Sequence, residues 1–364
     1  MNQQFAINAP LNNLSFGSVS IAILRELYNR GLAPSIFPIG PIDISAQKKD
    51  DGFEKWLNAC IGKAQKTHNR NDPCIKLWHI NGSLETPSKT SNLITFLETD
   101  SPTDSEINIL RNHEKVYVTN NYIKDILTNV GLDNVAYLPL GFDSHNFHQL
   151  EKRPKINGVT SWVCVGKLEF RKATLRQIRL WAAKYGNKKE HRLNAAIINP
   201  FLKPEDQNAM ISRALGGKHY LNINFLPFAP TNEEYNTTLQ SGDIVLTCSL
   251  SEGRGLGEYH STAMGAWPVA LNAHAYKDYL NNENAVLVEP CGKIDSTDGI
   301  FFKGAESGSE FNIGSFFDFK DEAFYAGCEE AERRVKTIGL NTAGYKLQEQ
   351  TCKETVDVLL AGLK

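Results

Sequence analysis

The sequence predicts an α/β protein built from two Rossmann-like βαβ domains, and three observations support this. With 364 residues, the chain is longer than a single hydrophobic core usually serves, so we expect two domains. Short runs of branched and aromatic residues alternate with segments of helical spacing, which is typical of parallel sheets covered by helices. In the second half, a glycine-rich turn joins such a strand to such a helix, as in many ligand sites of open α/β sheets.

The composition is ordinary for a globular protein. Hydrophobic residues make up 41% of the chain and charged residues 22%. The formal net charge of -2 gives no global field that would attract nucleic acid or acidic lipid. Seven cysteines are scattered along the chain without a Cys-x-x-Cys pair, so we expect neither a zinc site nor a disulfide framework.

Two further features predict the location of the protein. No apolar run approaches membrane-spanning length, and the first residues lack the basic and then apolar pattern of a signal peptide. Together with reduced thiols, these features predict an intracellular, cytoplasmic protein. A protein that is peripheral to a membrane, or one that works in an infected host cell, is compatible with the same features.

The first domain is expected to cover residues 1–150 and to open with a βαβ unit. Its expected strands cover residues 5–10, 34–39, 74–80, 92–102 and 115–120, and its expected helices lie at 19–30, within 43–72 and at 122–130. A polar loop with Ser15 and Gly17 follows the first strand, where ligands of such folds bind. Ligand contact and ordinary turn or N-cap chemistry both account for these two residues, and both interpretations stay open.

Carboxylates follow one of the expected strands of the first domain. Glu98 and Asp100 stand at the end of the strand that begins at Asn92, and catalytic groups of open α/β sheets gather at such strand ends. The competing explanation is an acidic helix N-terminus, which the helix dipole favours by itself. We take Glu98 as a candidate catalytic residue.

No metal site is expected. His145 and His148 stand three residues apart, but no third ligand lies nearby in sequence, so they predict a surface pair. His79, at the end of an expected strand, is interpreted as a structural histidine.

The second domain is expected to cover residues 151–345, after a charged, proline-containing link at 151–155. Its expected strands cover 162–165, 193–198, 244–246, 269–271 and 285–290, and its expected helices 173–185, 204–215, 232–240 and 322–335. Residues 291–318, rich in Gly, Ser and Phe, are an irregular insertion without an assignment. A further helical stretch, 343–363, includes the C-terminal segment 346–364.

The stretch from Thr247 to Pro268 is the centre of the expected site. It follows a buried strand, turns through glycines and enters a helix that ends near Gly265. Backbone N–H groups at such a turn and the positive end of the helix dipole bind anions, and glycine lets the backbone approach a ligand closely. Glu252, at the head of the turn, adds an acceptor suited to sugar hydroxyls.

This stretch resembles a known family. Ser-Leu-Ser-Glu-Gly-Arg-Gly-Leu at 249–256, followed by Ala-Met-Gly-Ala-Trp-Pro-Val at 263–269, resembles the donor-site signature of retaining GT-B glycosyltransferases of the family 4 type. The resemblance implies two Rossmann-like domains that face each other across a cleft. It also implies a set of donor-binding residues, namely Gly253, Arg254, Gly255, Leu256 and His260.

The signature departs from the family pattern at two positions. The second Glu of the pattern, which holds the nucleotide ribose in the family, falls on His260 here, and Glu258 lies two residues earlier. Either His260 takes over that contact or the ribose contact is built differently. Arg254 replaces the usual aromatic residue.

Other segments resemble the family in the expected order. Residues 139–147 resemble the Pro-x-Gly-Val-Asp-x-x-x-Phe segment that closes the first domain, and the last helix often crosses back to that domain in the family. The loop from Gly166 resembles Gly-Arg-Leu-x-x-x-Lys-Gly, whose two cations clamp the donor diphosphate and fall on Lys167 and Lys172. Residues 223–229 resemble the segment against the nucleotide base, which implies base contacts from Phe228 and Ala229.

The resemblance implies a retaining, metal-independent glycosyltransferase. Its donor is a nucleotide-diphosphate sugar, UDP-glucose or similar, with no other cofactor, and its acceptor is a hydroxyl of a glycan or lipid-linked saccharide. No Asp-x-Asp occurs in the chain, so a metal-chelating GT-A site is not supported. The expected catalytic residues are Glu98, Lys167, Lys172 and Glu252.

Two alternatives stay open. A DNA glycosyltransferase of the viral type, acting on a hydroxymethylated base, fits a local excess of positive charge: residues 152–192 hold twelve Lys or Arg against two acids. A degenerate GT-B domain that binds a nucleotide sugar without turnover is supported by His260 alone. The sequence leaves the sugar, the base, the acceptor and the oligomeric state undetermined.

Overall fold

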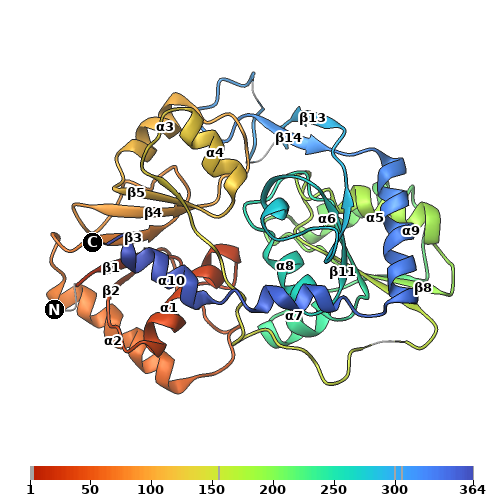
Figure 1. Ribbon diagram of the computed structural model, residues 1–364, viewed down its shortest axis with the longest axis horizontal. Coiled ribbons are helices and arrows are strands. Elements are labelled where there is room, and N and C mark those ends of the chain that lie inside the picture. Colours follow the sequence, from red (N-terminus) through yellow and green to blue (C-terminus); the bar gives the residue numbers. More distant parts are fainter. Residues whose placement is uncertain (1–3, 155, 299–300, 305, 364) are drawn as a thin grey trace. The chain divides into compact units, whose positions relative to one another are not determined.

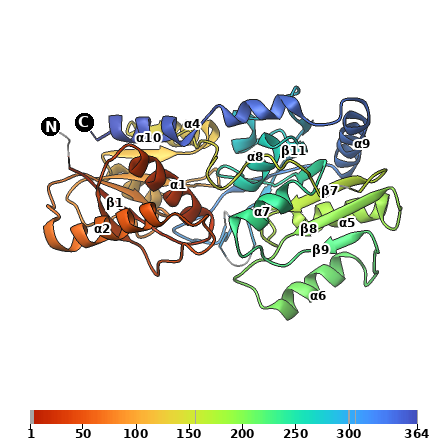
Figure 2. The ribbon, with the colours of Figure 1, turned by 90° about the horizontal axis from the view of Figure 1, so that it is seen from below.

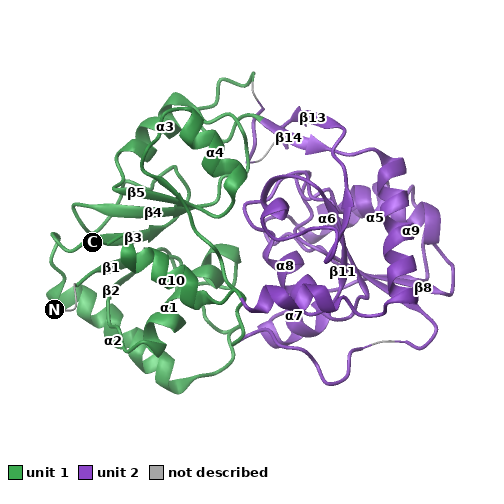
Figure 3. Ribbon diagram, viewed as in Figure 1, with its two compact units in different colours: residues 1–145, 305–314, 350–364 green, residues 146–304, 315–349 purple. Residues whose placement is uncertain are grey.

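The computed structural model describes residues 4–154, 156–298, 301–304 and 306–363, and the chain divides into two compact units (Figure 3). Unit 1 comprises Met1–His145, Ala305–Gly314 and Gln350–Lys364, and unit 2 comprises Asn146–Gly304 and Ser315–Glu349. The chain therefore passes from one unit to the other four times. The C-terminal segment groups with unit 1, and so does the tip of the insertion that had no assignment from the sequence.

Unit 1 is built on a six-stranded sheet in the order β2-β1-β3-β4-β5-β6, and every neighbouring pair is parallel (Figure 1). The strands are β1 (Ala6–Ala9), β2 (Ser35–Pro38), β3 (Cys74–Leu77), β4 (Ser91–Thr95), β5 (Lys115–Val118) and β6 (Val135–Tyr137). From β1 the chain first adds β2 on one side and later β3 on the other. The strand order therefore reverses between β1 and β3.

Several helices of unit 1 begin after a polar residue that caps their first turn. They are α1 (Ser15–Asn29), α2 (Asp51–Thr67), α3 (Asp104–Arg111), α4 (Asn121–Asn129) and α10 (Cys352–Ala361). Thr103 and Glu106 form a capping box at the start of α3, and Asn120 caps α4. In both Figure 1 and Figure 2, α1 and α10 lie side by side, and Arg30 pairs with Asp357 across them at 2.6 Å.

Unit 2 contains a second parallel six-stranded sheet, in the order β12-β11-β10-β7-β8-β9. Its strands are β7 (Thr160–Val165), β8 (His191–Ala196), β9 (Ile223–Phe225), β10 (Ile244–Thr247), β11 (Trp267–Leu271) and β12 (Val286–Val288). Its helices are α5 (Thr174–Tyr185), α6 (Pro204–Ala214), α7 (Asn232–Leu239), α8 (Leu256–Ala263), α9 (Asp321–Thr337) and the 3-10 turns η1 (His274–Asp278) and η2 (Thr342–Gln348). Here the order reverses between β7 and β10.

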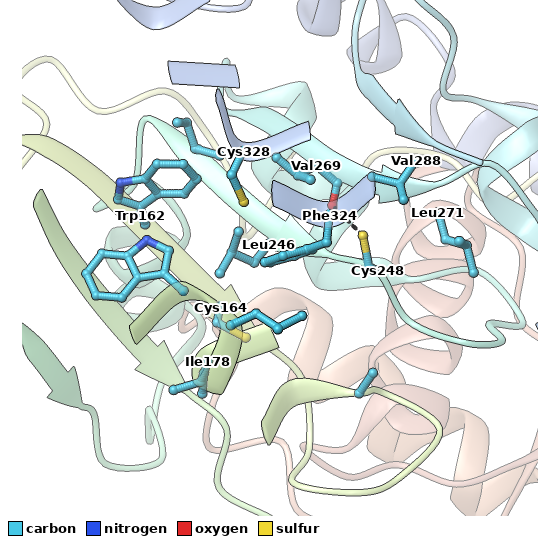
Figure 4. Packing of buried hydrophobic residues seen from close by; sticks show 14 of the residues in the cluster. Trp162, Cys164, Ile178, Leu246, Cys248, Val269, Leu271, Val288, Phe324 and Cys328 are labelled. Carbon is cyan, nitrogen blue, oxygen red and sulfur yellow. Dashed lines mark hydrogen bonds between the residues drawn. The ribbon is translucent and has the colours of Figure 1, made fainter. Parts of the chain in front are cut away.

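The core of unit 2 is formed by aromatic, branched and cysteine side chains (Figure 4). Trp162 and Trp181 meet edge to face at 6.3 Å, and Phe324 of α9 packs on the same cluster. Burial raises the pKa of the Cys164 thiol to about 12, so this cysteine acts as a small apolar side chain. All seven cysteines are free.

The expected α/β class with two parallel sheets is confirmed, and the structure refines three segments. The strand expected over 92–102 ends at Thr95, so Glu98 lies in the loop that leads to α3. The helical stretch expected over 343–363 is broken, because Thr351 and Glu354 form a capping box that starts α10 separately from η2. The insertion 291–318 contains an antiparallel ribbon of β13 (Gly292–Asp295) and β14 (Ser315–Asp318).

None of the helices within the described residues combines the length and the apolar character that crossing a membrane requires.

Candidate functional site

The strand reversal in unit 2 brings two of the sequence motifs together. β7 and β10 are neighbours, with Cys164 opposite Leu246, so the loop after β7 and the turn after β10 leave the same edge of the sheet. The first carries Lys167 and Lys172, and the second carries Glu252. Open parallel sheets bind ligands at the carboxyl ends of the strands where the order reverses, and this places the candidate site of unit 2 here.

A buried ion-pair cluster lies at this edge. The Lys172 ammonium is 2.5 Å from Glu252 Oε1 and 3.5 Å from Glu258 Oε1. The Arg171 guanidinium is 3.2 Å from Glu252 Oε2 and 2.7 Å from Glu169 Oε1. Because the Glu252 and Glu258 side chains are only 4% and 3% exposed, Lys172 is held firmly between two carboxylates.

The charges of the cluster set its protonation. Burial would raise the pKa of Glu252, but Lys172 and Arg171 outweigh it and lower that pKa to about 2. Burial would lower the pKa of Lys172, but the charges of Glu252 and Glu258 raise it above its usual value. For Glu258, burial raises the pKa, Lys172 opposes the rise and Glu252 adds to it. At neutral pH the cluster therefore presents a charged ammonium beside an ionised Glu252.

The glycine turn has a conformation that only small residues accommodate. Gly255 has a φ of 77° and precedes α8, and a Cβ on it would meet the Tyr276 ring at 2.7 Å. A Cβ on Gly257 would collide with the Tyr235 hydroxyl. Gly255 has no side chain to cap α8, and the N-terminal N–H groups of a helix form an anion-binding site.

Arg254, expected at the donor, is buried behind the turn. Its guanidinium lies 4.6 Å from the Tyr259 ring centre and 4.9 Å from that of Tyr279, and the Tyr279 hydroxyl donates to the Arg254 carbonyl at 3.0 Å. These contacts stabilise the turn from within. Any donor contact of Arg254 stays a prediction.

His260 has a fixed tautomer. Its Nδ1 lies 2.6 Å from the Leu256 carbonyl, which can only accept, so Nδ1 carries the hydrogen. The ring is buried and lies 4.1 Å from the Phe147 ring centre. Glu258, the other candidate for the second Glu of the motif, contacts Lys172 instead.

The remaining expected residues of unit 2 are more exposed. Lys167 is 3.6 Å from Glu169, and its ammonium lies 5.3 Å from the Phe201 ring centre. Leu256 is half-buried as the first residue of α8. Phe228, which is 48% exposed, and Ala229 follow the edge strand β9, two strands from β7.

Three expected residues belong to unit 1. Ser15 is exposed as the first residue of α1, and Glu98 is half-buried in the loop after β4. Gly17 is buried, and a Cβ there would collide with the Asn12 carbonyl. Gly17 is therefore needed for the packing of the preceding loop.

Sequence analysis missed a group of polar side chains behind the cluster. The Tyr276 hydroxyl is 2.5 Å from Thr247 Oγ1 and 3.5 Å from Glu258 Oε1. His274 Nε2 donates to the Ser249 carbonyl at 3.0 Å, and burial lowers the pKa of His274 to about 4, so the ring is neutral. In the sequence, only their position could have indicated these two residues, because both follow the expected strand 269–271, which neighbours β10.

No group of three or more His, Cys, Asp or Glu side chains that could hold a metal ion occurs among the residues described.

No protein-family model matches the chain, and no curated protein matches it. Solved structures match over the whole length. Sucrose-phosphate synthase from Thermosynechococcus elongatus has a TM-score of 0.70 at 11% identity, covering 100% of this chain and 98% of that chain. An α,α-trehalose-phosphate synthase (UDP-forming) from Burkholderia vietnamiensis has a TM-score of 0.64 at 11% identity, covering 100% and 97%. Anabaena HepE, solved with UDP and glucose, has a TM-score of 0.61 at 11% identity, covering 100% and 99%.

These similarities show the fold of the chain. A chain with two parallel six-stranded sheets matches the GT-B fold of glycosyltransferases, as the sequence predicted.

Proposed function

We propose that the protein is a retaining, metal-independent glycosyltransferase that moves a hexose from a UDP-sugar to an acceptor hydroxyl. The observation that carries the proposal is the Lys172 ammonium, held 2.5 Å from Glu252 beside an uncapped helix N-terminus at the strand reversal of unit 2. A diphosphate and a sugar need these groups: cations and amides for the first, and a carboxylate for the hydroxyls of the second. The GT-B fold supports the same class.

The chemistry follows from where charge develops. As the bond between the sugar C1 and the diphosphate oxygen breaks, negative charge grows on the leaving diphosphate. Lys167, Lys172 and the N–H groups around Gly253 and Gly255 neutralise it, and such stabilisation is commonly the largest catalytic term. The acceptor oxygen attacks C1 on the same face, and its proton passes to the departing phosphate oxygen, so configuration is retained.

The two carboxylates have different proposed roles. Ionised Glu252 accepts hydrogen bonds from the sugar hydroxyls and orients C1. Glu98 of unit 1 serves the acceptor. His260 or Glu258 contributes to the ribose contact, and Phe228 and Ala229 contact the base.

The acceptor proposed is a glycan or a lipid-linked saccharide in the cytoplasm. Part of the basic segment 152–192, which raised the DNA alternative, is neutralised within unit 2. Arg176 pairs with Asp318 at 2.6 Å and with Asp321 at 2.7 Å, both near the start of α9. Lys188 and Lys189 directly precede β8, so they lie at the amino ends of the strands, opposite the candidate site. We therefore rank DNA below a saccharide.

One experiment tests the proposal. The protein is incubated with UDP-glucose, UDP-galactose, UDP-N-acetylglucosamine or GDP-mannose, together with mixed oligosaccharide, lipid-linked and hydroxymethylated-DNA acceptors, with and without EDTA. We expect UDP release, a product heavier by one hexose in mass spectrometry, and an α-linkage by NMR that EDTA does not reduce. Saturable UDP-sugar binding without any release of nucleotide diphosphate across the panel would instead identify a binding module.

A further inference from the structure

A group of aromatic side chains lies at the strand reversal of unit 1. Phe16 stands in the first turn of α1 after β1, Trp78 and His79 follow β3, and Phe96 follows β4. The order of the sheet reverses between β1 and β3, so these rings lie where an open parallel sheet binds its ligand. We call Phe16, Trp78, His79 and Phe96 the aromatic platform.

The rings of the platform contact one another. The Phe16 ring centre is 4.5 Å from that of His79 and 5.0 Å from that of Phe96. Trp78 lies 5.5 Å from His79. His79 is exposed and the other three rings are half-buried, whereas the tryptophans of the unit 2 core, Trp162 and Trp181, are fully buried. Aromatic surface left in water at a ligand-binding edge indicates a binding surface rather than a core.

The rings of the platform are inclined to one another, Phe16 and Phe96 at 61° and Trp78 and His79 at 73°. The C–H groups of a pyranose carry partial positive charge and would fit against the negative faces of such rings. Its hydroxyls would then meet polar side chains at the rim, and Ser15 and Glu98 adjoin the platform in sequence.

The charge of the segments that carry the platform disfavours an anionic partner. The platform residues stand in three segments, 11–18, 78–84 and 96–102. These segments contain no Lys or Arg but do contain Glu98 and Asp100. A DNA backbone or a sugar phosphate would bring negative charge to these carboxylates without a cation in the same segments. An uncharged sugar incurs no such cost.

We propose that the platform binds the acceptor, and that this acceptor is an uncharged saccharide whose terminal pyranose packs on Phe16, Trp78, His79 and Phe96. This inference rests on the proposed glycosyltransferase function and specifies its acceptor class.

Calorimetric titration tests the proposal. The probes are maltose, cellobiose, lactose and chitobiose as neutral saccharides, glucose 6-phosphate and a hydroxymethylated DNA duplex as anions, and UDP as a reporter of unit 2. Trp78→Ala, Phe96→Ala and His79→Ala alter the platform, and the exposed position of His79 protects that variant against misfolding. Phe37→Ala is the matched control, because Phe37 is a half-buried phenylalanine of the same sheet that packs on His68 instead.

We expect saturable binding of at least one neutral saccharide. Trp78→Ala and Phe96→Ala should weaken it at least tenfold and His79→Ala at least threefold, while Phe37→Ala and all UDP affinities stay within twofold of wild type. The proposal is overturned if no neutral saccharide binds, if only glucose 6-phosphate or the duplex binds, or if platform variants bind the saccharide as wild type does. If a saccharide binds in a way that depends on Phe96 but UDP does not bind, the platform is still a saccharide site and the proposed glycosyltransferase function is refuted instead.

Discussion

Replacing Lys172 by Met removes one charge from the centre of the buried cluster and keeps the length of the side chain. The lost contact to the diphosphate is a charge-assisted one, worth about 1.5–3 kcal/mol in the transition state. This corresponds to a loss of turnover of roughly 13- to 160-fold. The same change leaves Glu252 with Arg171 alone and deprives Glu258 of its ammonium partner. Breaking a buried pair in this way costs about 3–5 kcal/mol of unfolding free energy.

Two companion variants separate these effects. Lys167→Met removes a half-exposed charge whose pair with Glu169 spans 3.6 Å, so it should reduce turnover while changing stability by less than about 1 kcal/mol. Lys172→Met combined with Glu258→Gln removes the unpaired carboxylate and should recover part of the stability but none of the turnover. The measurements are steady-state UDP release and urea denaturation at pH 7. A folded Lys172→Met protein with wild-type turnover would remove this loop from the donor site.

Three further predictions follow from the same unit. Glu252→Ala should lower turnover by at least tenfold through lost hydrogen bonds to the sugar, about 1.5–3 kcal/mol, and full activity in a UDP-release assay would show that the central signature is misaligned. The pKa of His274 is about 4 when folded and near 6.5 when unfolded, so its contribution to stability is present above pH 6.5 and is lost as pH falls towards 4. The control is His274→Asn, because Asn suits the φ of 40° at this position. Between pH 7 and pH 4 the wild type should lose about 3 kcal/mol more unfolding free energy than this variant. An equal loss in both proteins, measured by urea denaturation at the two pH values, would refute this. Lys188→Glu combined with Lys189→Glu should leave UDP affinity unchanged. The DNA alternative would be restored if the wild type bound a duplex with an affinity that falls steeply with salt, and if this variant lost that binding.

The sequence predicted most of the strands because they are short runs rich in apolar residues, and a parallel sheet buried on both faces requires such runs. It also singled out Lys172 and Glu252, which stand 80 residues apart in motifs that resemble one family and which the structure brings to 2.5 Å. Glu258 was interpreted as a displaced copy of the second Glu. Its contact with Lys172 depends on how α8 packs against the loop after β7, which sequence spacing does not report.

Other features depend on tertiary partners and left no local pattern. Arg176 belonged to a basic segment, and its acidic partners, Asp318 and Asp321, come from a distant part of the chain. Tyr276 and His274 act through buried contacts that no motif marks. The tip of the insertion could not be assigned from the sequence because its conformation depends on contacts with a distant segment. Thr103 donates to the Glu310 carbonyl at 2.6 Å, and the Asn312 N–H donates to Glu106 at 3.0 Å.

The four passages of the chain between the units constrain how the protein is made. Unit 1 includes α10, which ends at Ala361, so its fold is completed only after α10 has left the ribosome. Until then α1 lacks the helix beside it, and α3 lacks the segment 306–314. This chain therefore cannot follow the usual order, in which an N-terminal domain folds before the next domain is synthesised. For the same reason, no single cleavage site releases either unit whole, and an expression fragment that stops at residue 150 would expose apolar surface that α10 covers in the full chain.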